Sequence, residues 1–348
     1  MHLDLDADQV ALQEGVRTFC AGRFPPAVVR ASADGLDRDR WRELAELGVF
    51  GLTLPEADGG TGLAAADAVV VFEELGRAVV PGPLVASSLA AGAVPGVVGG
   101  DTVVTLVGPG PGGPGSPVLV EHLDAADVVL VLPGDGTDGD RGDGTDGPIT
   151  AVDAAAVRAA ARSVEPLDPA TPVSLVEALP AGDPVPGLDA AGLRRSGSLL
   201  TTALLLGIAE ATTGLALSYA QERTQFGRAI GSFQAVKHLV ADMFARTEVA
   251  RAAAYAAGVL VDEPDQGDAA RAVAAARVMA TRAAVANGKA CIQVHGGIGF
   301  TWEADPHLFL KRAWALAPRF GSLDEAAEEV ARHLLAAGRP AGPAGGDT

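Results

Sequence analysis

At 348 residues the chain is long enough to bury a large core, and its length predicts two or three domains. It is 48% hydrophobic but only 4% aromatic, and its formal net charge is −18. Such a charge excludes nucleic acid and anionic membranes as partners, since either would need a basic face. The two cysteines, Cys20 and Cys291, match no metal-binding spacing and no disulfide framework, which favours a cytoplasmic location.

The first hundred residues predict an N-terminal helical domain spanning 1–100. Apolar residues recur at helical spacing in 6–24, 37–52, 64–84 and from 84 to about 94. Aspartates cap the first two of these helices, and Pro81 and Pro83 stop the third. The glycine-rich segment LPEADGGTGL, at 54–63, predicts an exposed loop.

The sequence pattern changes from helical to strand-like between 101 and 187. Short β-branched runs separated by Gly, Pro and Asp clusters predict a reduced middle domain of antiparallel strands. Within it GDGTDG occurs twice, at 134–139 and 142–147. The repeat lacks the glutamate of an EF-hand loop, and two copies are too few for a stacked β-roll. It therefore predicts a disordered hairpin at 134–147 rather than a calcium site.

Residues 188–338 predict a C-terminal helical bundle, with long helices at 193–222, 232–262 and 268–294. Its alanine-rich helices suit close packing and an oligomer interface. The most membrane-like run, 199–217, contains Glu210 and four threonines, so we expect a helix buried between subunits rather than a membrane span. Residues 339–348 predict a disordered tail. The predicted fold class is mainly α with a small central β domain.

Common catalytic signatures are absent: the sequence has no GxxxxGK[ST], strand-linked GxGxxG, HExxH, CxxC or GxSxG. The informative segment is ERTQFGRAIGSFQAVKHLVADM, at 222–243. Arg223 ends one helix, Phe226 and Gly227 form a corner, and Gln234 lies on the next helix. An arginine fork can bind a pyrophosphate and an aromatic ring can flank a flat cofactor. On its own, however, an ordinary helix–loop–helix is the simpler interpretation.

A second segment, CIQVHGGIGFTWEAD at 291–305, interrupts this helical region with glycines. Glycine inside a helix costs about 1 kcal/mol per residue relative to alanine. Gly296, Gly297 and Gly299 are therefore expected to end the helix and to let backbone approach a ligand.

Together with LGVFGLTLPEADGGTGLAAADAVVVFEELGRA at 47–78, these segments resemble the acyl-CoA dehydrogenase family over nearly the whole chain. The resemblance implies a three-domain fold, FAD, an acyl-CoA substrate and electron-transferring flavoprotein as electron acceptor. It also implies that Arg223 reaches the FAD pyrophosphate of a neighbouring subunit. The other implied cofactor-binding residues are Gln225, Phe226 and Gln234 at the corner, and Gln293, Gly296 and Gly297, which line the adenosine part. His295 has no predicted role.

The sequence departs from the family at the catalytic base. Family chemistry needs a carboxylate to remove the α-proton of the thioester while a hydride leaves to flavin. The usual glutamate position, before the glycine of the matching corner, holds Phe320, and the position used in another branch holds Gly197. Neither can take a proton. The family's flavin-ring segment, roughly T-E-P-x-x-G-S-D, is also missing between 80 and 186.

The leading hypothesis is that this chain is the base-less subunit of a heteromeric acyl-CoA dehydrogenase, sharing FAD with a partner that supplies the base. One alternative is an active homo-oligomer with a displaced base. Its candidates, each more simply a helix-end acid, are Glu303, Asp305, Asp324 and Glu325. The other alternative is a flavin-free structural or binding protein.

Overall fold

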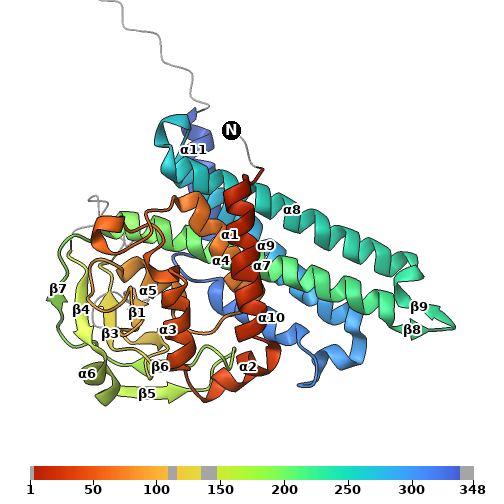
Figure 1. Ribbon diagram of the computed structural model, residues 1–348, viewed down its shortest axis with the longest axis horizontal. Coiled ribbons are helices and arrows are strands. Elements are labelled where there is room, and N and C mark those ends of the chain that lie inside the picture. The colour runs from red at the N-terminus through yellow and green to blue at the C-terminus, as the bar shows by residue number, and fades with distance from the viewer. Residues whose placement is uncertain (1–3, 109–115, 135–146, 338–348) are drawn as a thin grey trace, which may run out of the picture.

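The computed structural model describes residues 4–108, 116–134 and 147–337, and within them the first part of the chain is helical (Figure 1). Its helices are α1 (Ala7–Arg23), α2 (Pro26–Ala31), α3 (Arg38–Glu46), α4 (Ala65–Arg77) and α5 (Leu84–Ala90). Asp6 starts α1 through a capping box with Gln9, in which each side chain accepts a bond from the other's backbone N–H. Trp41, on α3, packs against Phe50 in the core with the ring centroids 4.4 Å apart.

Two small sheets follow in the chain. The strands are β1 (Val104–Val107), β2 (Val118–Glu121), β3 (Val128–Val131), β4 (Thr150–Asp153), β5 (Ala161–Val164), β6 (Val173–Val176) and β7 (Asp183–Pro184), with α6 (Ala154–Ala159) between β4 and β5. One sheet has the order β1-β3-β4-β7 and the other β2-β6-β5. The mainly α class with a small central β domain is thus confirmed.

One strand pair departs from the antiparallel prediction. β1 and β3 are parallel, with Val104 opposite Val128, whereas every other described pair of these two sheets is antiparallel. The reason is a crossover: the chain leaves β1, runs through β2 in the other sheet, and re-enters beside β1 in the same direction. The predicted hairpin at 134–147, apart from its two end residues, and the predicted tail at 339–348 lie outside the described residues.

The last part of the chain is a bundle of long helices. These are α7 (Ala190–Glu222), α8 (Gln234–Asp262), α9 (Ala269–His295), α10 (Pro306–Leu316) and α11 (Leu323–Ala337). A two-residue pairing of β8 (Thr224–Gln225) with β9 (Arg228–Ala229) joins α7 to α8 and projects at the far right of Figure 1. By length and composition α7 could cross a membrane, but 78% of its most apolar window is buried inside this chain. It is the core helix, buried by its own chain rather than only between subunits as the sequence suggested.

Helices α4 and α7 touch backbone to backbone. A Cβ added to Gly207 would lie 1.9 Å from the carbonyl oxygen of Glu73, and one added to Gly76 would lie 2.1 Å from that of Leu204. No side chain fits at either glycine, so the approach of the two helices requires both. Gly214, also on α7, has no heavy atom within 4 Å of such a Cβ.

We expect Gly207→Ala to destabilise the protein by about 3 kcal/mol or more, because α4 must shift away from α7 to admit the methyl group. Gly214→Ala on the same helix should instead be neutral or stabilise by up to about 1 kcal/mol through helix propensity. Denaturant unfolding of the two variants makes the comparison. Equal effects would show that the α4–α7 approach is not tight.

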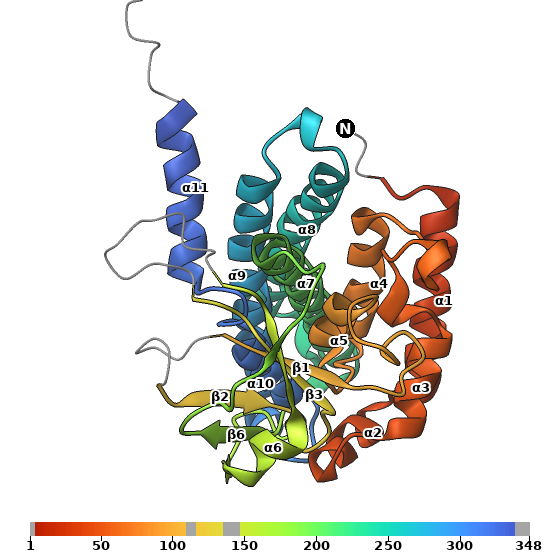
Figure 2. The ribbon, with the colours of Figure 1, turned by 90° about the vertical axis from the view of Figure 1, so that its left-hand side faces the viewer.

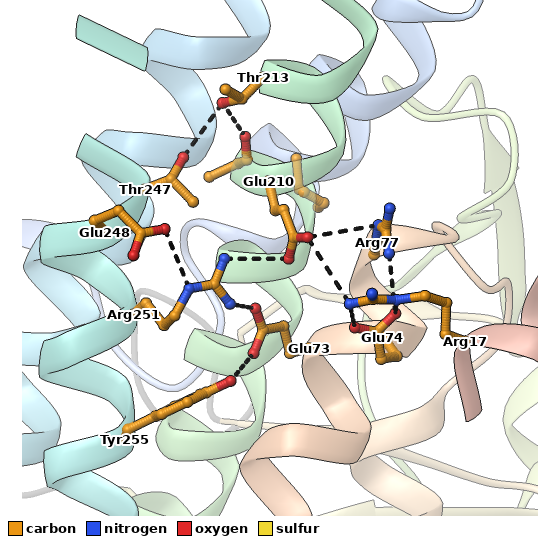
Figure 3. Close-up of polar contacts among 12 residues, drawn as sticks. Arg17, Glu73, Glu74, Arg77, Glu210, Thr213, Thr247, Glu248, Arg251 and Tyr255 are labelled. Carbon is orange, nitrogen blue, oxygen red and sulfur yellow. Dashed lines mark hydrogen bonds and ion pairs between the residues drawn. The ribbon is translucent and has the colours of Figure 1, made fainter. Parts of the chain in front are cut away.

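Beside this contact lies a partly buried charged network between α1, α4, α7 and α8 (Figure 3). Its members are Arg17, Glu73, Glu74, Arg77, Glu210, Arg251 and Tyr255. Glu73 is fully buried; it pairs with Arg251 and accepts a 2.7 Å hydrogen bond from the hydroxyl of Tyr255. Burial raises the pKa of Glu73 to about 7, against the lowering effect of Arg251 and Tyr255. Burial and the neighbouring Glu210 carboxylate thus both raise the pKa of this carboxyl toward neutral.

This carboxyl should make folding stability pH-dependent. The folded pKa of Glu73 lies above the ordinary value of 4.5, so the folded state binds the proton more tightly than the unfolded state. The associated stability is fully present below the ordinary value and is lost as pH rises through about 7. We expect Glu73→Gln to flatten the fall in unfolding free energy between about pH 4.5 and 7.

Denaturant titrations across this pH range provide the measurement. Glu248→Gln is the matched control, because Glu248 also pairs with Arg251 but from an exposed position. An unchanged slope in Glu73→Gln would assign the titration to another group.

A second buried ion pair joins all three parts of the chain. Arg312 on α10 pairs with Asp168, in the segment between β5 and β6, and donates a 2.9 Å hydrogen bond to the carbonyl of Val80, just before α5. Arg312 is 7% exposed and Asp168 2%. Burial alone would raise the pKa of Asp168, but Arg312 and Thr171 hold it below its ordinary value. Arg312 therefore ties the bundle to both the strands and the N-terminal helices.

Candidate functional site

The corner between α7 and α8 is a tight hairpin whose tip is unusually exposed. The backbone N–H of Arg223 donates to the carbonyl of Tyr219 and ends α7, and Gln225 then pairs with Arg228. Both tip residues have positive φ, +52° at Phe226 and +78° at Gly227, as a two-residue hairpin requires. Phe226 is 92% exposed. Within this chain its ring only meets the edge of Phe233, with the centroids 6.2 Å apart, so most of its apolar surface is left for an external contact.

The second segment forms where α9 ends. The helix stops at His295, as predicted, and Gly296 has φ +64° and ψ −142°, a conformation essentially restricted to glycine. A Cβ added to Gly296 or Gly297 meets no heavy atom within 4 Å. Gly299 differs, since its Cβ would lie 2.8 Å from the carbonyl oxygen of Ile292. Gly299 thus serves packing, whereas the paired glycines face open space, the arrangement needed if a ligand lies against backbone.

An aromatic stack holds these two segments together. The rings of Tyr219 and His295 lie 4.1 Å apart and nearly parallel, and the Nδ1 atom of His295 contacts the carbonyl of Cys291 at 2.8 Å. Tyr219 precedes Arg223 by one helical turn, and His295 follows Gln293 by two residues. The sequence assigned no role to His295, because only the fold reveals its partner. The stack fixes the arginine corner against the glycine turn.

All seven predicted cofactor-binding residues are exposed on this end of the bundle. They are Arg223, Gln225, Phe226, Gln234, Gln293, Gly296 and Gly297. The β8–β9 hairpin lies at the opposite end of the molecule from β1 to β7 (Figure 1). A dinucleotide touching Arg223 would therefore have its other side free for a second protein rather than for the strands of this chain.

The two positions where a base was sought in the sequence meet in the fold. A Cβ added to Gly197, on α7, would lie 2.2 Å from Cε1 of Phe320. Phe320 itself has φ +53° and is followed by Gly321 at +106°, so the corner is held in a left-handed conformation. The phenylalanine ring fills the space that a side chain at 197 would need. The ring of Phe320 therefore requires a glycine at 197, and the glycine leaves room for the ring.

Beside this ring lies a cavity of about 70 Å³ between α4, α5, α7, α10 and the strands. That volume holds a few water molecules and no tricyclic ring. Among the described residues that line it, the one carboxylate is Glu121 at the end of β2, which pairs with Arg319. His122 is buried there, and burial together with Arg312 lowers its pKa to about 3, so its imidazole stays neutral.

The displaced-base candidates lie elsewhere. None of Glu303, Asp305, Asp324 and Glu325 is among the described residues that line the cavity beside Phe320. Asp305 pairs with Arg30, and Glu325 accepts a 2.6 Å hydrogen bond from the backbone N–H of Ser322, next to the start of α11. Asp324 and Glu325 lie in the first turn of α11, as the sequence suggested, whereas Asp305 stands at the N-cap position of α10 without a capping hydrogen bond from its side chain.

Comparison with known proteins agrees with this geometry. The family models "Acyl-CoA dehydrogenase, N-terminal domain" and "Acyl-CoA dehydrogenase, C-terminal domain" match residues 6–97 and 196–335. Acyl-CoA dehydrogenase IpdE2 of Mycobacterium tuberculosis is 35% identical over 93% of this chain and 95% of its own length. IpdE2 of Mycolicibacterium smegmatis is 32% identical over 91% and 96%. This chain therefore belongs to the acyl-CoA dehydrogenase family, whose members are flavoprotein oxidoreductases of lipid metabolism.

One further relative and two solved structures are also similar to this chain. Acyl-CoA dehydrogenase FadE34 of M. tuberculosis is 34% identical over 88% of this chain but over only 44% of its own length. The ChsE4-ChsE5 complex of M. tuberculosis contains a chain with 25% identity and a TM-score of 0.80, covering 98% of this chain and 100% of that one. Butyryl-CoA dehydrogenase from Megasphaera elsdenii, at 20% identity and a TM-score of 0.75 over 96% and 100%, shares the fold.

The contact between Gly197 and Phe320 predicts non-additive mutations. Gly197→Ala should destabilise the wild-type chain, because its methyl group overlaps the phenyl ring. In a Phe320→Ala background the same change should be neutral or stabilising, giving a coupling energy of about 1–3 kcal/mol. A double-mutant cycle by denaturant unfolding measures it. Additive effects would mean that the ring does not occupy this space.

Proposed function

We propose that this chain is the base-less subunit of a heteromeric acyl-CoA dehydrogenase, contributing contacts to FAD held mainly by a partner subunit. The observation that carries the proposal is the difference between the two ends of the helical bundle. The predicted cofactor-binding residues are exposed at one end, whereas both base positions are inert and closed by Phe320 at the other. Such a chain can complete a neighbour's site but has no catalytic site of its own.

Two relatives support an assembly of unlike subunits. FadE34 contains a segment similar to this chain together with a longer stretch outside the match. The ChsE4-ChsE5 structure is a complex of two differently named chains. By analogy, the partner here is a second member of the family carrying the catalytic glutamate.

The residues of the exposed end suit a dinucleotide. The Arg223 guanidinium can form two parallel hydrogen bonds with a pyrophosphate, a fork that lysine cannot reproduce. Phe226 offers a ring face to a flat group, and the bare backbone at Gly297 leaves room for the adenosine part beside Gln293. FAD, when bound, supplies the hydride acceptor for α,β-dehydrogenation of an acyl-CoA thioester. Family membership suggests electron-transferring flavoprotein as the onward electron acceptor.

The alternatives leave more unexplained. A homo-oligomer would need a base, and the one carboxylate that lines the cavity beside Phe320 among the described residues is Glu121, already paired with Arg319. A flavin-free protein would give no reason for the 92% exposed ring of Phe226 or for the open space at Gly297. The buried free thiols of Cys20 and Cys291 suit the cytoplasmic location that we propose.

Arg223→Ala should deplete flavin from the complex formed with a co-expressed family member that carries the glutamate. A charge-assisted hydrogen bond contributes about 1.5–3 kcal/mol, so FAD affinity should fall by about one to two orders of magnitude. Arg223→Lys should restore part of it, since lysine keeps the charge but not the fork. The ratio of flavin to protein absorbance after gel filtration measures the effect.

Arg195→Ala is the control for this experiment, because Arg195 is an exposed arginine near the other end of α7. Thermal unfolding should be unchanged in both variants, since neither residue is in the core. Full flavin occupancy in Arg223→Ala would remove the basis of the proposed function.

A further inference from the structure

Helix α9 has a charge pattern opposite to that of the protein. The chain carries 44 acidic and 26 basic residues, yet the 27 residues of α9 include no aspartate or glutamate. Its arginines and lysine are Arg271, Arg277, Arg282 and Lys289. A helix that carries positive but no acidic side chains, in so acidic a chain, indicates that some of its charges pair with acids of another protein.

Two of these cations stand at a groove between α9 and the turn from α10 to α11, with α11 beside α9 (Figure 2). The groove is shallow and open, with a volume of about 580 Å³. Arg282 and Lys289 line it together with a mostly apolar wall of Val285, Ala286, Ala317, Pro318 and Leu323. Within the described part of the chain neither cation is in an ion pair.

Two of the four acids of α11 are occupied by other groups. Glu325 accepts the backbone N–H of Ser322, and Glu329 pairs with Arg332 and His333. Asp324 and Glu328 are exposed, and no ion pair links them to α9. The helix that packs against α9 therefore does not neutralise Arg282 or Lys289.

A buried hydroxyl at the groove also lacks a partner. Thr281 lines the groove and is 4% exposed, but its Oγ1 atom makes no hydrogen bond within the described residues. One turn earlier, and not among the residues that line the groove, Arg277 donates through Nη2 to the carbonyls of Leu316 and Ala317, while its Nε and Nη1 atoms are unpaired. Buried polar groups are normally hydrogen-bonded, so an acceptor beside Thr281 would satisfy the hydroxyl that the groove leaves unpaired.

The groove shares a face with the proposed cofactor residues. Arg282, Lys289 and Gln293 are all exposed and lie at helical positions i, i+7 and i+11, on one side of α9. Lys289 precedes Gln293 by four residues, about 6 Å along the axis. A protein that holds a dinucleotide over Gln293 therefore extends over the groove as well.

We infer that this groove is a docking site for the partner subunit, filled by an apolar segment whose carboxylates pair with Arg282 and Lys289. The inference rests on the proposed function for the existence of the partner. The chemistry of the occupant follows from the groove: apolar walls, two unpaired cations at the rim and a buried hydroxyl that requires an acceptor.

The same groove disfavours a second copy of this chain. In a two-fold contact each residue meets its symmetry counterpart or a reciprocal neighbour. A two-fold axis through the middle of this stripe, near Val285 and Ala286, would set Arg282 of one copy against Lys289 of the other. Two positive charges would then be desolvated next to each other, and their repulsion is unfavourable. The positions of Arg282 and Lys289 thus favour an acidic partner over a second copy of this chain.

The test is charge reversal in the complex with a co-expressed family member that carries the glutamate. Arg282→Glu combined with Lys289→Glu should raise the dissociation constant of the complex at least ten-fold. Arg162→Glu combined with Arg195→Glu makes the same charge change at exposed positions away from α9 and should leave assembly unchanged. Native mass spectrometry and sedimentation measure assembly, and circular dichroism checks that each variant is folded.

The dependence of complex stability on ionic strength distinguishes ion pairing at the groove from a general structural effect of the substitutions. The wild-type complex should weaken as ionic strength rises, because salt screens ion pairs, and the double variant should lose most of this dependence. Assembly of the double variant with wild-type affinity would overturn the inference. A stable dimer of the wild-type chain alone, with α9 protected from hydrogen exchange, would overturn it too.

The outcome also separates this inference from the proposed function. If the complex forms and resists charge reversal while Arg223→Ala still loses flavin, the docking site is wrong and the proposed function stands. If charge reversal disrupts the complex but Arg223→Ala keeps its flavin, the docking site stands and the cofactor role fails. Absence of any complex with the wild-type chain would overturn both.

Discussion

The buried pair of Arg312 and Asp168 is the contact on which the arrangement of this chain depends. It joins α10 to the strand region, and through the carbonyl of Val80 it also reaches the N-terminal helices. With both side chains nearly excluded from water, either charge left alone would be strongly destabilising. The pair therefore specifies how three separately patterned segments meet, rather than simply adding stability.

The position of α10 in turn sets the corner that carries Phe320. From α10 the chain turns through a left-handed corner, and the phenyl ring comes to rest on α7 where Gly197 has no side chain. A mid-helix glycine and a left-handed phenylalanine are each unfavourable locally. Their contact accounts for both, and it explains why neither position carries a carboxylate.

Helix α9 runs from the Phe320 corner to the exposed end that carries Gln293 and the arginine corner. Its middle bears the groove beside the Phe320 corner, and its end presents Gln293 and the paired glycines next to the arginine corner. The stack of Tyr219 on His295 keeps the two exposed segments in register. A rigid helix, cationic along its length, therefore carries both surfaces that we assign to a partner: one for its cofactor and one for its acids.

The sequence by itself determined the features that depend on neighbours along the chain. It predicted the mainly α class with a central β region, the end of α9 before its glycines, and the inert identity of residues 197 and 320, because propensity, caps and side-chain chemistry are local. Only the tertiary structure decided that Gly197 and Phe320 touch, that β1 and β3 run parallel, that α7 is buried by its own chain, and that His295 stacks on Tyr219. Each of these results depends on contacts between residues far apart in the chain, where many alternative pairings satisfy the same local pattern and only the packed whole selects one.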